Sequence, residues 1–414
     1  MNMKVKYVER IWVDVPFRPV PRRNMIRELP HWTIFELCKV SLECGVVGIG
    51  ETMAFYTWGK VTDESVKRII GKPATECMWD DSLGAGLQMA LFDAVGRALE
   101  VPIHQLVGTK LRDDAFISWW SIDMPPEDLQ SECIEAIKQG YTNYKFKARP
   151  WFDLHEQLRA VTQQAPDHFE IDLDFNAMCN DSAHGVRILR EMEKYNQVKI
   201  YETPIPHGDV AGYKHLRSQT CIPLAMHVGE PPLMTALTED ICDGFVVCGG
   251  VSRILRESHI IAAANKVFWL QLTGTGLTAT FALHLAAVCS HARWPAVDCH
   301  TIYEHNLLTE PIHVSNGLTK IPQQPGLGVE LCWDTVEKYR IEPIEKPYPY
   351  PDLLIRLTWP SGAEDYYTHG QQYWDEFLQG RKPVFSPGVH MEVLPNDGST
   401  QWRNLYESVS NKPF

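Results

Sequence analysis

The feature of the sequence that most constrains its fold is a unit repeated between residues 115 and 303. Segments rich in β-branched and aromatic residues recur there every 20 to 30 residues, and most gaps carry helical patterns, as at 126–139, 155–164, 184–195 and 252–265. The eight candidate strands are residues 115–122, 143–148, 169–176, 198–203, 222–228, 244–248, 267–272 and 296–303. Eight such units predict a (β/α)₈ barrel, whose active site lies at the carboxyl ends of the strands.

Polar side chains gather on one face of these strands or at their ends. They are Lys145, Lys147 and Arg149 in or just after the second strand, Asp172, Asp174 and Asn176 in the third, and Glu202 and His227 near the ends of the next two. An edge strand can also carry a row of cations, as protection against pairing with another chain. A basic strand followed by an acidic one favours instead an interior that binds something.

Residues 1–112 do not share this rhythm and predict an α+β domain. Strands are expected within 5–15, 33–42 and 46–51, and a core helix over 87–99. Between the first two strands, residues 16–32 hold four prolines and four arginines, which predicts a long loop with either a functional or a merely connecting role. Residues 53–58 are apolar and aromatic, and we expect them to form a second loop.

The C-terminal segment, residues 326–414, is rich in Pro, Tyr and Trp. The stretch 346–351 alternates Pro with Lys or Tyr and is expected to be extended. We expect this segment to pack on the first domain or on a partner subunit, and the sequence assigns it no chemistry.

Composition narrows the classes of partner. The net charge of -13 argues against nucleic acid, so an acidic small molecule would need a local cationic site. No apolar run reaches the length of a membrane helix, and charges interrupt the first ten residues where a signal peptide would be apolar, which predicts a cytoplasmic protein. The eleven cysteines contain no C-x-x-C pair, so neither a disulfide framework nor a zinc ribbon is indicated.

Five motifs in order give the chain a family resemblance. They are Lys145-Phe-Lys147, Asp174-Phe-Asn176, Tyr201-Glu-Thr-Pro204, Asn306-Leu-Leu-Thr-Glu-Pro311 and Pro325-Gly-Leu-Gly-Val-Glu-Leu331. Over about residues 3 to 340 the chain resembles the enolase superfamily, specifically its mandelate racemase/muconate-lactonizing branch. The resemblance implies a modified TIM barrel over 113–325 with an N-terminal α+β capping domain over 1–112. Two capping loops, residues 16–32 and 53–60, would close over the barrel mouth.

The same resemblance implies a Mg²⁺ site at the ends of strands three to five. The ion would bind a substrate carboxylate and stabilise the enediolate that forms when a base removes the α-proton. Asp174 and Glu202 match the first two metal ligands, and Lys147 matches the base, with Lys145 beside it. Neighbouring cations offer a means to lower the pKa of Lys147 toward that of a working base.

The departures from the family pattern leave alternatives open. At the third ligand position stands His227, with Glu230 three residues later, so either His227 binds a softer ion such as Mn²⁺ or Glu230 reaches in; His227 could also be purely structural. Residues 268–274 contain no histidine to serve as an opposite-face base. On the eighth strand Asp298 and His300 are the remaining polar candidates, and one of them is expected to face the mouth.

The sequence thus predicts a divalent-metal-dependent lyase, a dehydratase of sugar acids acting through an enediolate. Arg149, Asn176, Asp298 and His300 are the candidate substrate-binding residues; an arginine of loop 16–32 could assist, and Arg149 could instead pair with Asp172. The alternatives are an epimerase or racemase in which Lys147 works with His227 or His300, and a non-catalytic barrel with a binding or structural role. A homo-oligomer is expected.

Overall fold

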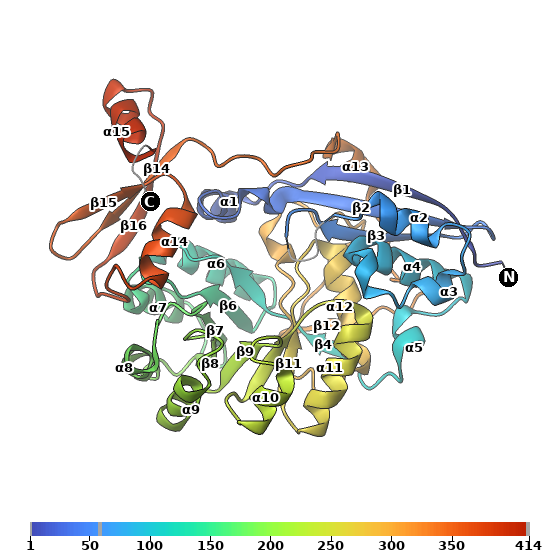
Figure 1. Ribbon diagram of the computed structural model, residues 1–414, viewed down its shortest axis with the longest axis horizontal. Coiled ribbons are helices and arrows are strands. Elements are labelled where there is room, and N and C mark those ends of the chain that lie inside the picture. Colours follow the sequence, from blue (N-terminus) through green and yellow to red (C-terminus); the bar gives the residue numbers. More distant parts are fainter. Residues whose placement is uncertain (1, 57–59, 411–414) are drawn as a thin grey trace.

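The computed structural model describes residues 2–56 and 60–410, so residues 57–59 of the predicted second capping loop lie outside the described residues. An antiparallel sheet of order β13-β1-β2-β3 lies over a curled parallel sheet of order β11-β10-β9-β8-β7-β6-β5 (Figure 1). This is the α/β architecture predicted from the sequence, a capping domain on a TIM-like barrel. No helix of the described residues combines the length and apolar character needed to cross a membrane.

The cap joins the N-terminal elements to one short strand from beyond the barrel. Its strands are β1 (Val5–Asp14), β2 (Ile34–Leu42), β3 (Val47–Met53) and β13 (Arg340–Ile341). Its helices are α1 (Pro19–Met25), η1 (Pro30–Thr33), α2 (Asp63–Ile69), α3 (Ala74–Cys77), η2 (Asp81–Leu83), α4 (Ala85–Ala98) and α5 (Ile103–Val107). The core helix α4 packs closely on β3. Gly48 permits this approach, since a Cβ atom there would lie 2.2 Å from the Ala90 carbonyl oxygen.

Residues 16–32 are not the irregular loop that the prolines predicted. Pro19 begins helix α1, where its missing N–H is not needed, and Pro30 begins η1. The arginines Arg18, Arg23 and Arg27 of this segment already have acidic partners. They form ion pairs with Glu132, Asp128 and Asp123 of the barrel.

The barrel alternates strands and helices in register. Its strands are β5 (Trp119–Ser121), β6 (Asn143–Lys147), β7 (Glu170–Asp174), β8 (Val198–Glu202), β9 (Leu224–His227), β10 (Gly244–Val247) and β11 (Val267–Leu270). Its helices are α6 (Pro126–Lys138), α7 (Leu154–Thr162), α8 (Ser182–Met192), α9 (Val210–Gln219), α10 (Leu233–Thr238), α11 (Val251–Ala263) and α12 (Gly276–Val288). Their order places Lys147, Asp174 and Glu202 side by side at one end of the sheet.

The eighth predicted strand, 296–303, is wrong as a strand. Isolated bridges join Ala296 to Ile117, just before β5, and Val297 to Gln271, just after β11. The two residues Ala296 and Val297 thus connect the two ends of the parallel sheet. Cys299 then takes a left-handed backbone (φ 59°) and η3 (His300–Ile302) follows, which ends the extended chain. The first predicted strand is also divided, since β4 (Asp114–Phe116) pairs with β12 (Leu318–Lys320) and only β5 joins the barrel.

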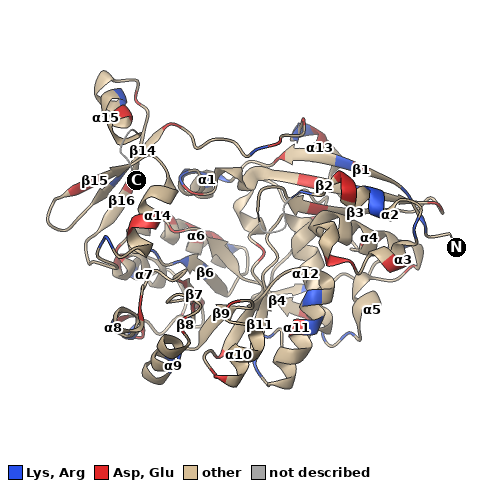
Figure 2. Ribbon diagram, in the orientation of Figure 1, with Lys and Arg blue, Asp and Glu red and all other residues tan. Residues whose placement is uncertain are grey.

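The chain beyond the barrel forms α13 (Trp333–Lys338) and a small separate unit. That unit contains β14 (Leu353–Thr358), β15 (Glu364–Tyr367), α14 (Gly370–Leu378), β16 (His390–Pro395) and α15 (Thr400–Ser410), with sheet order β15-β14-β16. It lies beside the cap and over the barrel helices α6 and α7 (Figure 1). Acidic and basic residues are interspersed over the elements visible in Figure 2, without one basic face.

Candidate active site

Lys145 is the buried centre of a charged cluster at the carboxyl ends of β6, β7 and β8. Its ammonium forms an ion pair with Glu202 and lies 3.6 Å from Asp174 Oδ2. It also donates to Gln271 Oε1 at 3.0 Å and lies 4.9 Å from the centre of the Trp269 ring. Burial lowers the pKa of Lys145, but the charges of Glu202 and Asp174 outweigh it and raise the pKa above its ordinary value. Lys145 is therefore a fixed positive charge.

Lys147 is the more accessible of the two lysines. Its side chain is 17% exposed, and Nζ donates to Asp174 Oδ2 at 2.5 Å and to Asn176 Oδ1 at 2.9 Å. Burial alone would raise the pKa of Asp174, but the charges of Lys147, Lys145 and Arg149 hold it well below its ordinary value. Lys147 thus stands at the edge of the cluster with an anion and an amide holding its amine.

His227 faces the same cluster from the end of β9. Its Nε2 lies 2.9 Å from Glu202 Oε1. Burial lowers the pKa of His227, but interactions with Cys248 and Glu202 raise it to about 9. With this raised pKa His227 is an imidazolium at neutral pH and can donate a proton.

Arg149 and Asn176, the predicted substrate-binding residues after β6 and β7, bond to each other. Arg149 is buried, and its guanidinium donates to Asn176 Oδ1 at 2.6 Å and to the Asp174 carbonyl at 3.0 Å. It does not pair with Asp172, which accepts instead from Asn143 at 3.1 Å and whose pKa burial raises to about 7. Asn176 Oδ1 thus joins Arg149 to Lys147, and substrate binding by these two residues stays a prediction.

Asp298 and His300 differ from the expectation that one of them would face the mouth. Both are buried; His300 Nε2 lies 3.3 Å from the Tyr141 hydroxyl, and burial raises the pKa of the Asp298 carboxyl well above its ordinary value. Burial raises the pKa of the Cys299 thiol between them, and the charges of Lys145 and Lys147 oppose that rise. The left-handed backbone at Cys299 breaks the alternation from which the expectation was drawn.

The donor set does not fit a magnesium ion. Asp174 and Glu202 are each paired with a lysine, the third ligand position holds the imidazolium of His227, and Glu230 is exposed. Within residues 2–56 and 60–410, no three His, Cys, Asp or Glu side chains are grouped to hold a metal ion. Two carboxylates already face four cations, counting Arg149, and a divalent cation would add to an excess of positive charge.

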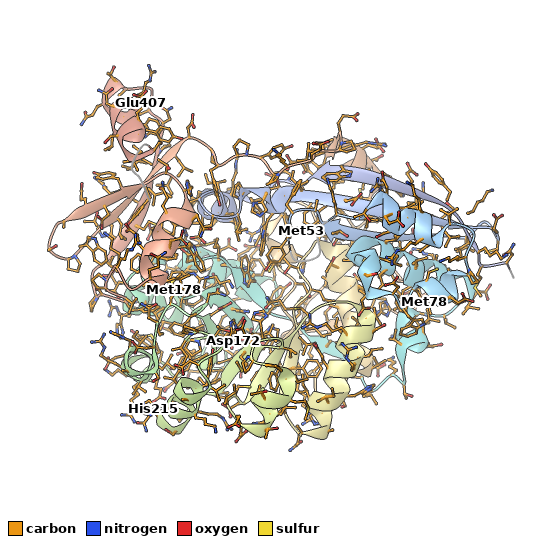
Figure 3. All side chains as sticks on the ribbon, in the orientation of Figure 1. Met53, Met78, Asp172, Met178, His215 and Glu407 are labelled. Carbon is orange, nitrogen blue, oxygen red and sulfur yellow. The ribbon has the colours of Figure 1, made fainter. Side chains whose placement is uncertain are left out.

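A cavity of about 130 Å³ opens beside the cluster, between the cap and the barrel. Its wall includes His227, Cys248 and Gln271 from the barrel and Met53, Tyr56 and Met89 from the cap. Met53 lies between the two layers, above Asp172 (Figure 3). Glu51 also lines it, but its carboxylate already accepts from Thr275 and Thr278. The cavity thus meets the charged cluster at His227 and Gln271, and much of the rest of its wall is apolar.

Sequence reasoning missed Gln271, Cys248, Cys299 and Trp269. Cys248 follows β10, Gln271 follows β11 and Cys299 follows the bridge segment, so their place after a strand was a usable signal. Their residue types gave no such signal, because glutamine and cysteine at such positions usually serve packing.

Comparison with known proteins supports the family and the fold. A family model, "Enolase C-terminal domain-like", matches residues 128–335. Muconate cycloisomerase 1-2 of Acinetobacter lwoffii is 26% identical over 373 residues, which is 82% of this chain and 96% of that enzyme. D-gluconate dehydratase of Thermoproteus tenax is 26% identical over 302 residues, 66% of this chain but only 60% of that enzyme. N-succinyl-L-Arg/Lys racemase of Bacillus cereus is 22% identical over 293 residues, 68% of this chain and 76% of that enzyme.

Solved structures agree with the architecture. The crystal structure of muconate cycloisomerase from Pseudomonas fluorescens superimposes with a TM-score of 0.68 at 20% sequence identity, covering 83% of this chain and 100% of that one. At this identity the match establishes the fold alone.

Proposed function

Because the chain belongs to the mandelate racemase/muconate-lactonizing branch of the enolase superfamily, we propose that Lys147 removes a proton from the carbon next to a substrate carboxylate. The observation that carries this proposal is the position of its amine. Nζ lies at the carboxyl end of β6, partly exposed, and is held by Asp174 and Asn176 beside the fixed charge of Lys145. In its neutral form such an amine is a general base at a defined place.

The cations around Lys147 supply the charge that the reaction needs. Removing an α-proton next to a carboxylate gives an enediolate, which carries a second negative charge. Lys145 and the imidazolium of His227 both contact Glu202 beside Lys147, and fixed positive charge there would stabilise that species. Members of the superfamily generally use Mg²⁺ for this task, but the donor set described above does not fit it, and no step here depends on a metal.

The first candidate outcome is elimination, the dehydration of a sugar acid. Lys147 takes the α-proton and His227 donates a proton to the β-hydroxyl, which leaves as water; the resulting enol becomes a 2-keto acid. The raised pKa of His227 supports the role of proton donor. D-gluconate dehydratase and the D-xylonate dehydratase of Haloferax volcanii, 24% identical over 295 residues, are relatives whose names carry this chemistry.

The second candidate is a racemase or epimerase, favoured by the placement of two acid/base groups on different strands. Lys147 ends β6 and His227 ends β9, so the groups flank the site from separated positions. After Lys147 removes the proton, His227 would return one to the other face of the α-carbon. His300 is not a partner in this scheme, since it bonds to Tyr141 away from the lysines.

A panel of acids incubated with the enzyme in D₂O tests the proposal. The panel contains D-gluconate, D-xylonate, cis,cis-muconate and N-succinyl amino acids, and the readouts are 2-keto acid formation and deuterium at the α-carbon by NMR. Elimination predicts 2-keto acid, and racemisation predicts deuterated, inverted substrate. Absence of both across the panel, with added Mg²⁺ or Mn²⁺ as well as without, would count against α-proton chemistry and favour a binding role.

A further inference from the structure

The C-terminal unit packs on the barrel loops that carry the lysine end of the site. Helix α14 (Gly370–Leu378) lies over the loop after β6, where Trp151 contacts the rings of Tyr373, Trp374 and Phe377 at centroid distances of 4.6, 5.7 and 5.5 Å. Phe385 packs on Phe175 after β7 at 5.6 Å. This unit is therefore part of the wall around β6 and β7, as its place in Figure 1 indicates.

Buried polar contacts fix the position of α14. The hydroxyl of Tyr373 donates to Glu28 at 2.6 Å and accepts from Arg27 at 2.8 Å. Arg27 also pairs with Asp123, which accepts from the Trp151 indole at 2.6 Å. Because these groups are buried, sliding the helix would take the Tyr373 hydroxyl from Glu28 and Arg27 and leave each charged group with one hydrogen bond fewer. Helix α14 is thus held rigidly against the barrel.

Through Trp374 the helix touches the active-site cluster itself. The Trp374 ring lies over the guanidinium of Arg149 at 4.6 Å, and Arg149 is only 2% exposed. Arg149 donates to Asn176 Oδ1, and Lys147 donates to the same oxygen. These two cationic donors fix the orientation of the Asn176 amide. If the amide turned over, its NH₂ group would face the N–H donors of Lys147 and Arg149, and no hydrogen bond could form. A line of contacts therefore runs from Trp374 through Arg149 and Asn176 to Lys147.

We propose that Trp374 is a positioning residue for Lys147, and that the C-terminal unit is thereby a functional wall of the active site. The proposal rests on the proposed function in taking Lys147 as the base. The aromatic face keeps water from the guanidinium, so that Arg149 keeps both of its bonds and Asn176 keeps its oxygen toward the amine. Removing the ring frees the amide and takes from Lys147 one of its two acceptors.

This wall lies beyond the part of the chain that the family model matches. That match ends at residue 335, and the Pseudomonas fluorescens structure is matched over its full length by 83% of this chain. The helix that covers Arg149 begins at Gly370.

Chemical labelling of Lys147 tests the proposal without a substrate. The intact protein is treated with acetic anhydride at fixed pH, and the acetylation rate of Lys147 is measured by peptide mass spectrometry relative to exposed Lys194. Loss of one hydrogen bond is expected to raise this rate about two- to tenfold in Trp374→Ala. Trp374→Phe keeps an aromatic face, so its Lys147 should be acetylated at about the rate of the unchanged chain. Trp402→Ala is the matched control, because Trp402 packs on Tyr406 within the same unit.

A double-mutant cycle separates positioning from general loosening. Arg149→Met removes the guanidinium but leaves Trp374 its packing, so it should raise labelling as Trp374→Ala does, and the double variant should add nothing further. Unchanged labelling in a folded Trp374→Ala, additive effects, or an equal effect of Trp402→Ala would overturn the proposal. If labelling responds as expected while no acid exchanges its α-proton, positioning stands and the role of Lys147 as base fails.

Discussion

Replacing His227 by aspartate should convert the charged cluster into a metal site. In the present chain two carboxylates, Asp174 and Glu202, face the cations Lys145, Lys147, Arg149 and the imidazolium. The variant replaces a cation by a third carboxylate at the end of β9, which leaves three anions and three cations. Hard oxygen ligands are also the ones that Mg²⁺ prefers.

The size of the effect follows from the charges. Two unit charges about 4 Å apart interact by about 4 kcal/mol at an effective dielectric constant of about 20, and the substitution turns a repulsion of the ion into an attraction. The cost of burying a new carboxylate offsets part of this gain. A net gain of about 2.8 kcal/mol, or about 100-fold in Kd, is a conservative expectation.

Isothermal titration calorimetry with Mg²⁺ and Mn²⁺ measures this directly. The unchanged chain should bind either ion weakly, and His227→Asp should bind Mg²⁺ at least about 100-fold more tightly. His227→Asn separates loss of the positive charge from gain of a carboxylate, and His215→Asp on the exposed face of α9 (Figure 3) controls for added negative charge. Tight Mg²⁺ binding by the unchanged chain that disappears in Asp174→Asn with Glu202→Gln would refute the reasoning.

Two further outcomes follow from the buried charges. The folded-state pKa of His227 is raised from 6.5 to about 9, so its contribution to stability is complete below about pH 6.5 and is lost as the pH rises through 9; the melting temperature should fall over that window more than in His227→Gln. Arg27→Met leaves Asp123 and Glu28 buried without their partner and should cost about 3–5 kcal/mol in urea unfolding, whereas Arg22→Met on the exposed side of α1 should cost almost nothing; equal midpoints for the two variants would contradict the buried network.

The barrel could be predicted where period-two alternation and strand ends carry the information. Lys147, Asp174 and Glu202 were placed together because parallel strands end at one edge, and the structure puts them there. The segment after Ala296 could not be predicted in the same way. A single left-handed residue, Cys299, ends the alternation between Asp298 and His300, both of which are buried, and its residue type does not predict this backbone.

The contacts that decide residue roles were the least predictable part. Arg149 looked like a substrate ligand because its cover, Trp374, lies more than two hundred positions away in a segment without barrel periodicity. The arginines of residues 16–32 looked available for the same reason, since their acidic partners lie in or just before α6. Local patterns place a side chain on a face, but they do not report which distant chain covers it.

Loss of α-proton exchange in Lys147→Ala is the most direct test of the account. The measurement is incorporation of deuterium from D₂O into whichever panel acid the unchanged enzyme accepts, with the fold checked by melting temperature. Because a general base contributes about 10² to 10⁴ in rate, exchange should fall by at least that range while the melting temperature stays close to that of the unchanged chain. Exchange that persists in a folded Lys147→Ala would contradict the account and assign the proton transfer to another group, with His227 as the next to be tested.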